Sequence, residues 1–147
     1  MSSFRTDLLA LLRRERYAVA STVNAEGKPQ SALVGIAVTD GFDLIFDTLA
    51  GTRKAANLRR DPRIAFVIGP TANNASCTVQ YEGVAEELTG EDRDAMLPLY
   101  YEVFPDGRPR RNWPGLIYFR VKPTWIRYSN YAFDPPEIVE LGPEDLG

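Results

Sequence analysis

The sequence contains no histidine and only one cysteine, Cys77, among its 147 residues. Without histidine, the Ser-His-Asp and Cys-His arrangements, the usual zinc sites and the commonest general base near neutral pH are all absent. A single cysteine excludes an internal disulfide and any paired-cysteine metal or redox motif. We therefore expect no metal site. If the protein is an enzyme, we expect a bound cofactor to carry the chemistry while the chain supplies position and electrostatics.

The chain also lacks a long apolar run and an excess of positive charge. No apolar segment approaches the ~18 residues of a membrane span, and the opening residues Met-Ser-Ser-Phe-Arg-Thr-Asp contain no hydrophobic signal region. The formal net charge of −3 argues against general nucleic-acid binding, which favours a basic surface. These absences predict a cytoplasmic protein with neither a nucleic-acid nor a membrane partner.

Short β-prone segments separated by turn residues follow one another along most of the chain. We expect strands at 17–23, 29–39, 42–48, 64–68, 76–88, 116–121 and 124–128, and helices at 3–16, 53–60 and from 89 onward. The tail from 134 onward is rich in proline and glycine, so we expect a packed arm without regular structure. Hairpin order with few helices predicts a single mainly β domain, residues 1–147, folded as an antiparallel closed or split β-barrel with flanking helices.

Two glycines lie inside the expected strands. Gly35 interrupts an apolar segment, which indicates a strand covered on both faces or one whose backbone is closely approached. Gly83 breaks the alternation of the long strand at 76–88, and we expect a β-bulge there.

A short basic helix follows the strand around Phe46. Thr52 stands where a helix N-cap belongs, and the cations Arg53 and Lys54 follow it at the end of the helix dipole that disfavours positive charge. An anion bound at this end would explain the pair, because free backbone N–H groups, a hydroxyl and two cations would converge on it. Phosphate is the natural candidate. The plainer alternative is a surface helix with solvated basic residues.

A second basic cluster lies in the irregular segment 105–115, where Arg108, Arg110 and Arg111 precede Trp113. A solvated loop is the plainer interpretation of this cluster. The alternative is that Trp113 covers a planar ligand.

The residues of the basic helix carry a family resemblance. The segment 46–54, Phe-Asp-Thr-Leu-Ala-Gly-Thr-Arg-Lys, is followed by Asn57-Leu58 and Asp61-Pro62-Arg63, and the later segment 82–86 reads Glu-Gly-Val-Ala-Glu. Together they resemble the flavin-binding region of the pyridoxamine 5'-phosphate oxidase-like split-barrel family. The resemblance covers 17–88 well and 118–128 loosely. It implies an FMN-binding split barrel that forms a homodimer, with the flavin in a groove between the subunits.

The resemblance also implies a set of cofactor contacts. Arg53 and Lys54 match the phosphate-binding pair of the family and Thr52 the neighbouring hydroxyl, while Asp47 replaces a tyrosine. Thr78 stands where the oxidase has a glutamine supplied by the dimer partner. The full set of implied cofactor-binding residues is Leu33, Val34, Asp47, Thr48, Thr52, Arg53, Lys54 and Thr78. No side chain is assigned a catalytic role.

Several departures separate this chain from the true oxidases. Ala32 and Ala37 stand where the oxidase carries an arginine for the flavin and a lysine for the substrate phosphate. Ser129 stands near a tryptophan of the oxidase, and its Arg-x-His element cannot exist here. We therefore expect an FMN-dependent oxidoreductase acting on another small molecule. The alternatives are a reductase that uses the deazaflavin coenzyme, or a module that binds flavin or heme without turnover.

Late aromatic residues give a separate reason to expect a homodimer. Tyr118, Phe119, Trp125, Tyr128 and Tyr131 lie close together in the sequence, and we expect a small barrel to be unable to bury them all alone.

Overall fold

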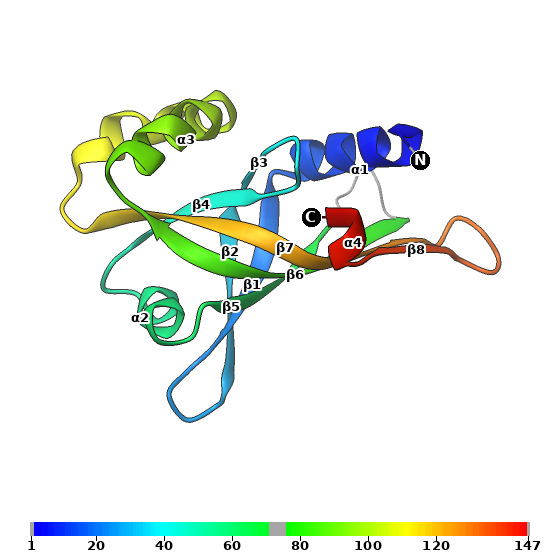
Figure 1. The fold of residues 1–147 in the computed structure, drawn as a ribbon, viewed down its shortest axis with the longest axis horizontal. Coiled ribbons are helices and arrows are strands. Elements are labelled where there is room, and N and C mark those ends of the chain that lie inside the picture. Colours follow the sequence, from blue (N-terminus) through cyan, green and yellow to red (C-terminus); the bar gives the residue numbers. More distant parts are fainter. Residues whose placement is uncertain (1, 71–75, 147) are drawn as a thin grey trace.

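The computed structural model describes residues 2–70 and 76–146 (Figure 1). Its helices are α1 (Ser2–Glu15), α2 (Arg53–Arg60), α3 (Gly90–Val103) and α4 (Pro143–Leu146), with 3-10 turns η1 (Pro105–Gly107) and η2 (Pro109–Asn112). Its strands are β1 (Tyr17–Val23), β2 (Pro29–Gly35), β3 (Ala37–Val38), β4 (Leu44–Leu49), β5 (Arg63–Ile68), β6 (Cys77–Leu88), β7 (Leu116–Asn130) and β8 (Glu137–Leu141). Within these residues no helix combines the length and the hydropathy that crossing a membrane requires.

The strands form one antiparallel sheet that curls into a barrel. Their order is β2-β1-β5-β6-β7-β4-β3, with β8 paired to β7 outside this path. Only Ile36 separates β2 from β3 in the chain, although these strands stand at opposite ends of the order. The sheet must therefore bend until its two ends meet, and the barrel is split between them. The predicted mainly β, antiparallel split barrel with flanking helices is confirmed.

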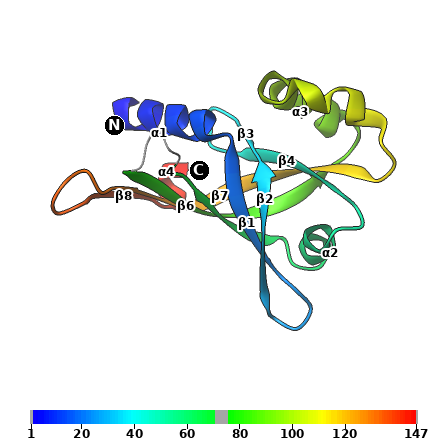
Figure 2. The ribbon, with the colours of Figure 1, turned by 180° about the vertical axis from the view of Figure 1, so that it is seen from behind.

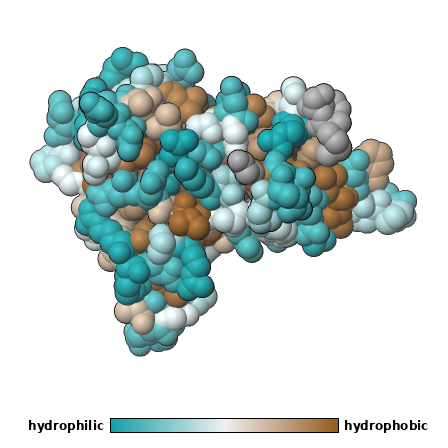
Figure 3. Space-filling view, viewed as in Figure 1, coloured by the Kyte–Doolittle hydropathy of each residue, from teal (hydrophilic) through white to brown (hydrophobic). Residues whose placement is uncertain are grey.

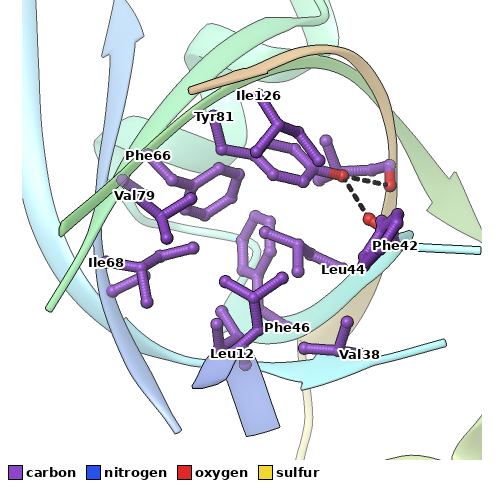
Figure 4. Packing of buried hydrophobic residues seen from close by; sticks show 14 of the residues in the cluster. Leu12, Val38, Phe42, Leu44, Phe46, Phe66, Ile68, Val79, Tyr81 and Ile126 are labelled. Atoms are coloured by element: carbon purple, nitrogen blue, oxygen red, sulfur yellow. Dashed lines mark hydrogen bonds between the residues drawn. The ribbon is translucent and has the colours of Figure 1, made fainter. Parts of the chain in front are cut away.

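The main core fills the barrel and is rich in aromatic rings (Figure 4). Phe46 is fully buried, stacks on Phe119 with 5.4 Å between ring centroids, and meets the edge of Phe66. The Tyr81 hydroxyl donates to the carbonyl oxygens of Phe42 and Val121 at 2.8 and 3.2 Å. Burial raises the pKa of this phenol, so it stays a neutral donor that ties the turn before β4 to β7.

A second core lies between β4, β7 and helix α3. Tyr118 of β7 is fully buried there, and its hydroxyl lies 3.2 Å from that of Tyr101. Phe119 is buried on the opposite side of the same strand, in the main core. The expectation that these late aromatics exceed what one barrel can bury is therefore wrong for Tyr118 and Phe119, because consecutive strand residues face two separate cores.

Both strand glycines have a packing reason. A side chain at Gly35 would collide with Phe104, whose ring lies 2.6 Å from the position of an added Cβ, so the predicted close approach to this backbone is confirmed. At Gly83 an added Cβ would lie 2.5 Å from the Lys122 carbonyl oxygen. The register between β6 and β7 shifts between Glu82 and Gly83, which confirms the predicted bulge.

The prediction of two separate late strands, with a break at Lys122-Pro123, is wrong. The structure has one continuous strand, β7, in which Pro123 pairs with Gly83 and Trp125 with Glu82. Thr124 is the extra residue of the bulge, and its hydroxyl donates to the Glu82 carbonyl oxygen at 3.2 Å. The bulge explains how proline is tolerated inside a strand, because the hydrogen-bond ladder is already interrupted there.

The C-terminal tail is more regular than its composition suggests. Residues 137–141 form β8, which pairs antiparallel with the end of β7, and helix α4 follows it. The expectation of an irregular tail is wrong because Pro135 and Pro136 lie in the 131–136 connection, where they do not interrupt the ladder, and Pro143 begins α4.

Candidate functional site

The N-terminus of α2 is capped by a hydroxyl that is itself held in place. Thr52 has extended backbone angles, φ −79° and ψ 158°, and its Oγ1 accepts from the Ala55 N–H at 3.3 Å. The same hydroxyl donates to the Leu49 carbonyl oxygen at 2.9 Å. Because its proton is used there, Thr48 is the donor of the 3.0 Å contact between the two threonine hydroxyls. Thr48 and Thr52 thus fix the start of the helix, as the N-cap prediction required.

Helix α2 is attached to the β1–β2 hairpin by a buried amide. The Asn57 Nδ2 donates to Thr22 Oγ1 and to Gln30 Oε1, both at 2.9 Å. Asn57 and Thr22 are almost completely buried, so losing either bond leaves polar atoms without water to replace the partner. Figure 2 shows α2 lying beside the lower half of this hairpin. The helix N-terminus therefore has a fixed position relative to β2.

A pocket of about 170 Å³ lies between the start of α2 and the two hairpin strands. Its lining residues are Ala20, Thr22, Gln30, Ser31, Ala32, Thr52, Arg53 and Lys54. Strand β2 forms one wall, and among the described strands it pairs only with β1, so its other edge presents backbone N–H and C=O groups without a strand partner.

Two cations stand at this pocket. Arg53 is exposed, whereas Lys54 is partly buried. Burial lowers the pKa of the Lys54 ammonium, and the neighbouring Asp47 carboxylate partly offsets this effect. Neither Arg53 nor Lys54 forms an ion pair within the part of the chain that the structure describes. Two cations and the free N–H groups of the first helical turn can together hold an anionic group such as phosphate.

The other predicted site residues are distributed differently. Leu33 and Val34 lie on β2 beside the pocket, but Leu33 is 69% exposed on the outer face and Val34 points into the core. Only their backbone can border a ligand at the strand edge. Asp47 lies between the anion pocket and the second core, where burial raises the pKa of the Tyr100 hydroxyl and the Asp47 charge raises it further.

Thr78 is not brought to this pocket within one chain. It lies near the start of β6, opposite Ser129, and β6 is separated from β1 by β5. Along β1 the pocket lies at Ala20 and Thr22, whereas the β6 end that carries Thr78 faces the start of β1. Only Thr78 of a second copy of the chain could contact a ligand in this pocket.

Three residues that build the site were not predicted from the sequence as site residues. Asn57, Thr22 and Gln30 form the hydrogen-bonded link between α2 and the hairpin. The available signal was the spacing within α2, where Asn57 lies three residues after Lys54 and beside the buried Leu58. A polar residue on the buried face of a short helix indicates a specific partner.

The fold is that of a split-barrel protein, and two cations stand at the pocket between its α2 N-terminus and its edge strand β2. The family model described as Pyridoxamine 5'-phosphate oxidase matches residues 4–130. The chain belongs to this family, as its sequence resemblance indicated. No curated protein matches the sequence significantly.

Solved structures show the same fold at low sequence identity. A heme binding protein from Mycobacterium smegmatis superposes with a TM-score of 0.80 and 18% identity over 97% of this chain, which spans 59% of that protein. A pyridoxamine 5'-phosphate oxidase-related, FMN binding protein from Nostoc punctiforme has a TM-score of 0.71 and 14% identity, covering 96% of this chain and 97% of that one. A conserved hypothetical protein from Mycobacterium tuberculosis has a TM-score of 0.69 and 25% identity, covering 86% and 84%.

Proposed function

We propose that this protein is an FMN-dependent oxidoreductase that acts on a small molecule. The observation that carries the proposal is the pocket in which Thr52, Arg53 and Lys54 face the edge of β2. FMN has a phosphate for the helix N-terminus and a planar ring with donors and acceptors for a backbone edge. The FMN-binding relative from Nostoc punctiforme supports this choice of cofactor.

The residues of this chain would bind and orient the cofactor. Arg53 and Lys54 would hold the phosphate, with the Thr52 and Thr48 hydroxyls beside it. The backbone of Leu33 and Val34 would border the ring. When bound, a flavin supplies hydride chemistry, and no side chain of the pocket need act as an acid or a base.

The substrate is proposed to differ from pyridoxamine phosphate. Ala37, at the position of the substrate lysine in the oxidase, is 1% exposed and packs in the second core. It can neither supply a cation nor be reached by a substrate phosphate. The oxidase reaction would therefore need a replacement for a charge-assisted contact that this position lacks.

A purified-protein spectrum tests the proposal and its alternatives. We expect the absorption bands of an oxidised flavin, bleached on reduction and restored by air. The deazaflavin coenzyme has a different band, and heme has a strong band of its own. Heme is the second candidate because the similar protein from Mycobacterium smegmatis binds it, although this chain offers no histidine as an iron ligand. Protein that purifies with heme, and takes up no FMN when titrated, would replace the flavin proposal.

We further propose that the protein is a homodimer that forms through the outer face of the sheet. Leu33, Val19 and Val67 are adjacent across β2, β1 and β5, because Val19 pairs with both of the others. Their exposed fractions are 69%, 41% and 50%, so they form a row of uncovered apolar side chains on the face of the sheet opposite Ala20 and Ala32, which line the pocket. Such an uncovered apolar row favours an interface. It replaces the buried aromatics Tyr118 and Phe119 as the reason to expect a second subunit.

A charge placed in this row should dissociate the dimer. We expect Val67→Lys to shift the protein from dimer to monomer at micromolar concentration in sedimentation equilibrium, because two-fold symmetry places the new charge in the interface twice. Val67→Thr is the matched control, since it keeps the β-branched shape without a charge and should remain dimeric. Thermal melts of both variants test whether a loss of dimer reflects general unfolding. If the parent protein is a monomer while it binds FMN, the shared-groove proposal fails.

A further inference from the structure

The β7–β8 hairpin ends in an exposed aromatic tip that projects from the body of the protein (Figures 1 and 3). Tyr131 and Phe133 are 59% and 57% exposed. The base of the tip is ordered, because the Tyr131 N–H donates to the Ser76 carbonyl oxygen at 2.8 Å and the Ala132 N–H to Asn130 Oδ1 at 3.0 Å. We call residues 131–138 the arm. Large aromatic side chains held out on an ordered hairpin indicate a binding surface.

The arm is acidic as well as aromatic. Asp134 and Glu137 lie on it, and residues 134–147 contain five acidic residues and no basic residue. Neither Asp134 nor Glu137 forms an ion pair within residues 2–70 and 76–146. A surface that receives the arm should therefore be basic and should offer aromatic or guanidinium faces.

One surface of this chain has that chemistry, at residues 108–113, which we call the basic segment. Trp113 is 52% exposed, with the Arg110 guanidinium 5.7 Å from its ring centroid. Arg108 lies 5.2 Å from the Tyr101 ring centroid. Of the three arginines, only Arg111 has an ion pair among the described residues, with Asp94 at 2.9 Å. The guanidinium groups of Arg108 and Arg110 are therefore available for an ion pair with another partner.

The arm and the basic segment stand at opposite ends of the same strand. Trp113 precedes the first residue of β7 by three positions, and Tyr131 follows its last residue directly. A strand of 15 residues spans roughly 45 Å at ~3.3 Å per residue. The two surfaces therefore cannot meet within one chain. In a two-fold dimer whose axis passes beside β7 and perpendicular to it, the second copy of the strand runs in the opposite direction, so each end of β7 lies near the opposite end of the other copy.

We propose that the arm of each subunit docks on the basic segment of the other. The inference rests on the proposed homodimer and specifies a contact within it. The Gly115 carbonyl oxygen accepts from the Ala50 N–H at 2.7 Å, so the basic segment adjoins the turn that leads into Thr52. A docked arm would then wall the anion pocket with Phe133 of a second copy, so that each site is completed by both chains.

Charge reversal tests the contact. Asp134→Lys with Glu137→Lys should weaken the dimer at least tenfold in sedimentation equilibrium at low salt, and so should Arg108→Glu with Arg110→Glu. A chain carrying all four changes should regain most of the parent affinity, because the charges are complementary again. Reversing Glu26 and Lys28, an exposed ion pair on the β1–β2 turn, is the matched control and should have no effect. If the quadruple variant does not recover dimer affinity although both double variants are folded, the docking is overturned.

Cross-linking separates failure of this inference from failure of the dimer. Phe133→Cys combined with Trp113→Cys should give a covalent dimer on oxidation, since these positions are too far apart to join within one chain. Phe133→Cys combined with Lys28→Cys should give none. A non-covalent dimer that does not cross-link through the first pair would overturn the arm contact while the homodimer stands. A monomer at every concentration tested would overturn both.

Discussion

Arg53→Ala should weaken FMN binding by ~1.5–3 kcal/mol, roughly ten- to a hundredfold, while riboflavin binding hardly changes. Riboflavin lacks only the phosphate, and the Arg53 side chain stands at the α2 N-terminus where that phosphate would lie. Lys54→Ala should show the same selectivity with a smaller loss. A guanidinium can hold two phosphate oxygens. The Lys54 ammonium is a point charge, and it also interacts with the neighbouring Asp47 carboxylate.

The measurement is a titration of apoprotein with FMN and with riboflavin, for the parent and both variants. Arg53→Lys is the matched control, because it keeps the charge and should retain part of the FMN affinity. Ligand-free stability should be almost unchanged, since removing a cation from a helix N-terminus relieves an unfavourable dipole interaction of a few tenths of a kcal/mol. Equal losses for both flavins would mean that the pair shapes the pocket rather than binding phosphate. No loss for either would leave a solvated basic helix end.

Local sequence signals were sufficient to predict where helix α2 begins and ends and that the strands form a barrel. The N-cap role of Thr52 and the end of α2 before Asp61-Pro62 follow from backbone chemistry within a few residues. The same holds for Gly83, whose place in an alternating strand marked the bulge. Strand alternation and hairpin turns predicted the architecture because an antiparallel barrel is built largely from neighbouring segments.

Features that depend on long-range pairing could not be predicted. Pro123 was expected to end a strand, and only the bulge opposite Gly83 lets β7 continue through it. The β8 segment lacks a strong strand pattern of its own. It forms a strand because its backbone pairs with the end of β7. Asn57 was recognised as part of a motif, but its partners lie 35 and 27 residues away on the hairpin. The pocket therefore needed the fold before its walls could be named.

Gly83→Ala should destabilise the protein by about 3 kcal/mol, the upper end of the range for overpacking. The added Cβ would meet the Lys122 carbonyl oxygen at 2.5 Å and Val121 Cγ1 at 2.7 Å. A backbone carbonyl in the middle of a sheet cannot move without breaking the pairing between β6 and β7. The free energy of unfolding from chemical denaturation measures the loss. The added Cβ meets atoms of β7 that do not line the pocket at the α2 N-terminus, so the FMN affinity of the folded fraction should be unchanged.

Gly35→Ala is the matched comparison, because its added Cβ also meets an atom closer than 3 Å. The obstacle there is the Phe104 ring, at 2.6 Å, which is a side chain that can rotate or shift. We expect a cost of about 1 kcal/mol for Gly35→Ala, and combining it with Phe104→Leu should remove most of the clash. No second substitution of that kind can relieve Gly83→Ala, since the atom in its way belongs to the backbone. Equal costs at the two glycines would show that the β7 backbone can yield as readily as an aromatic ring.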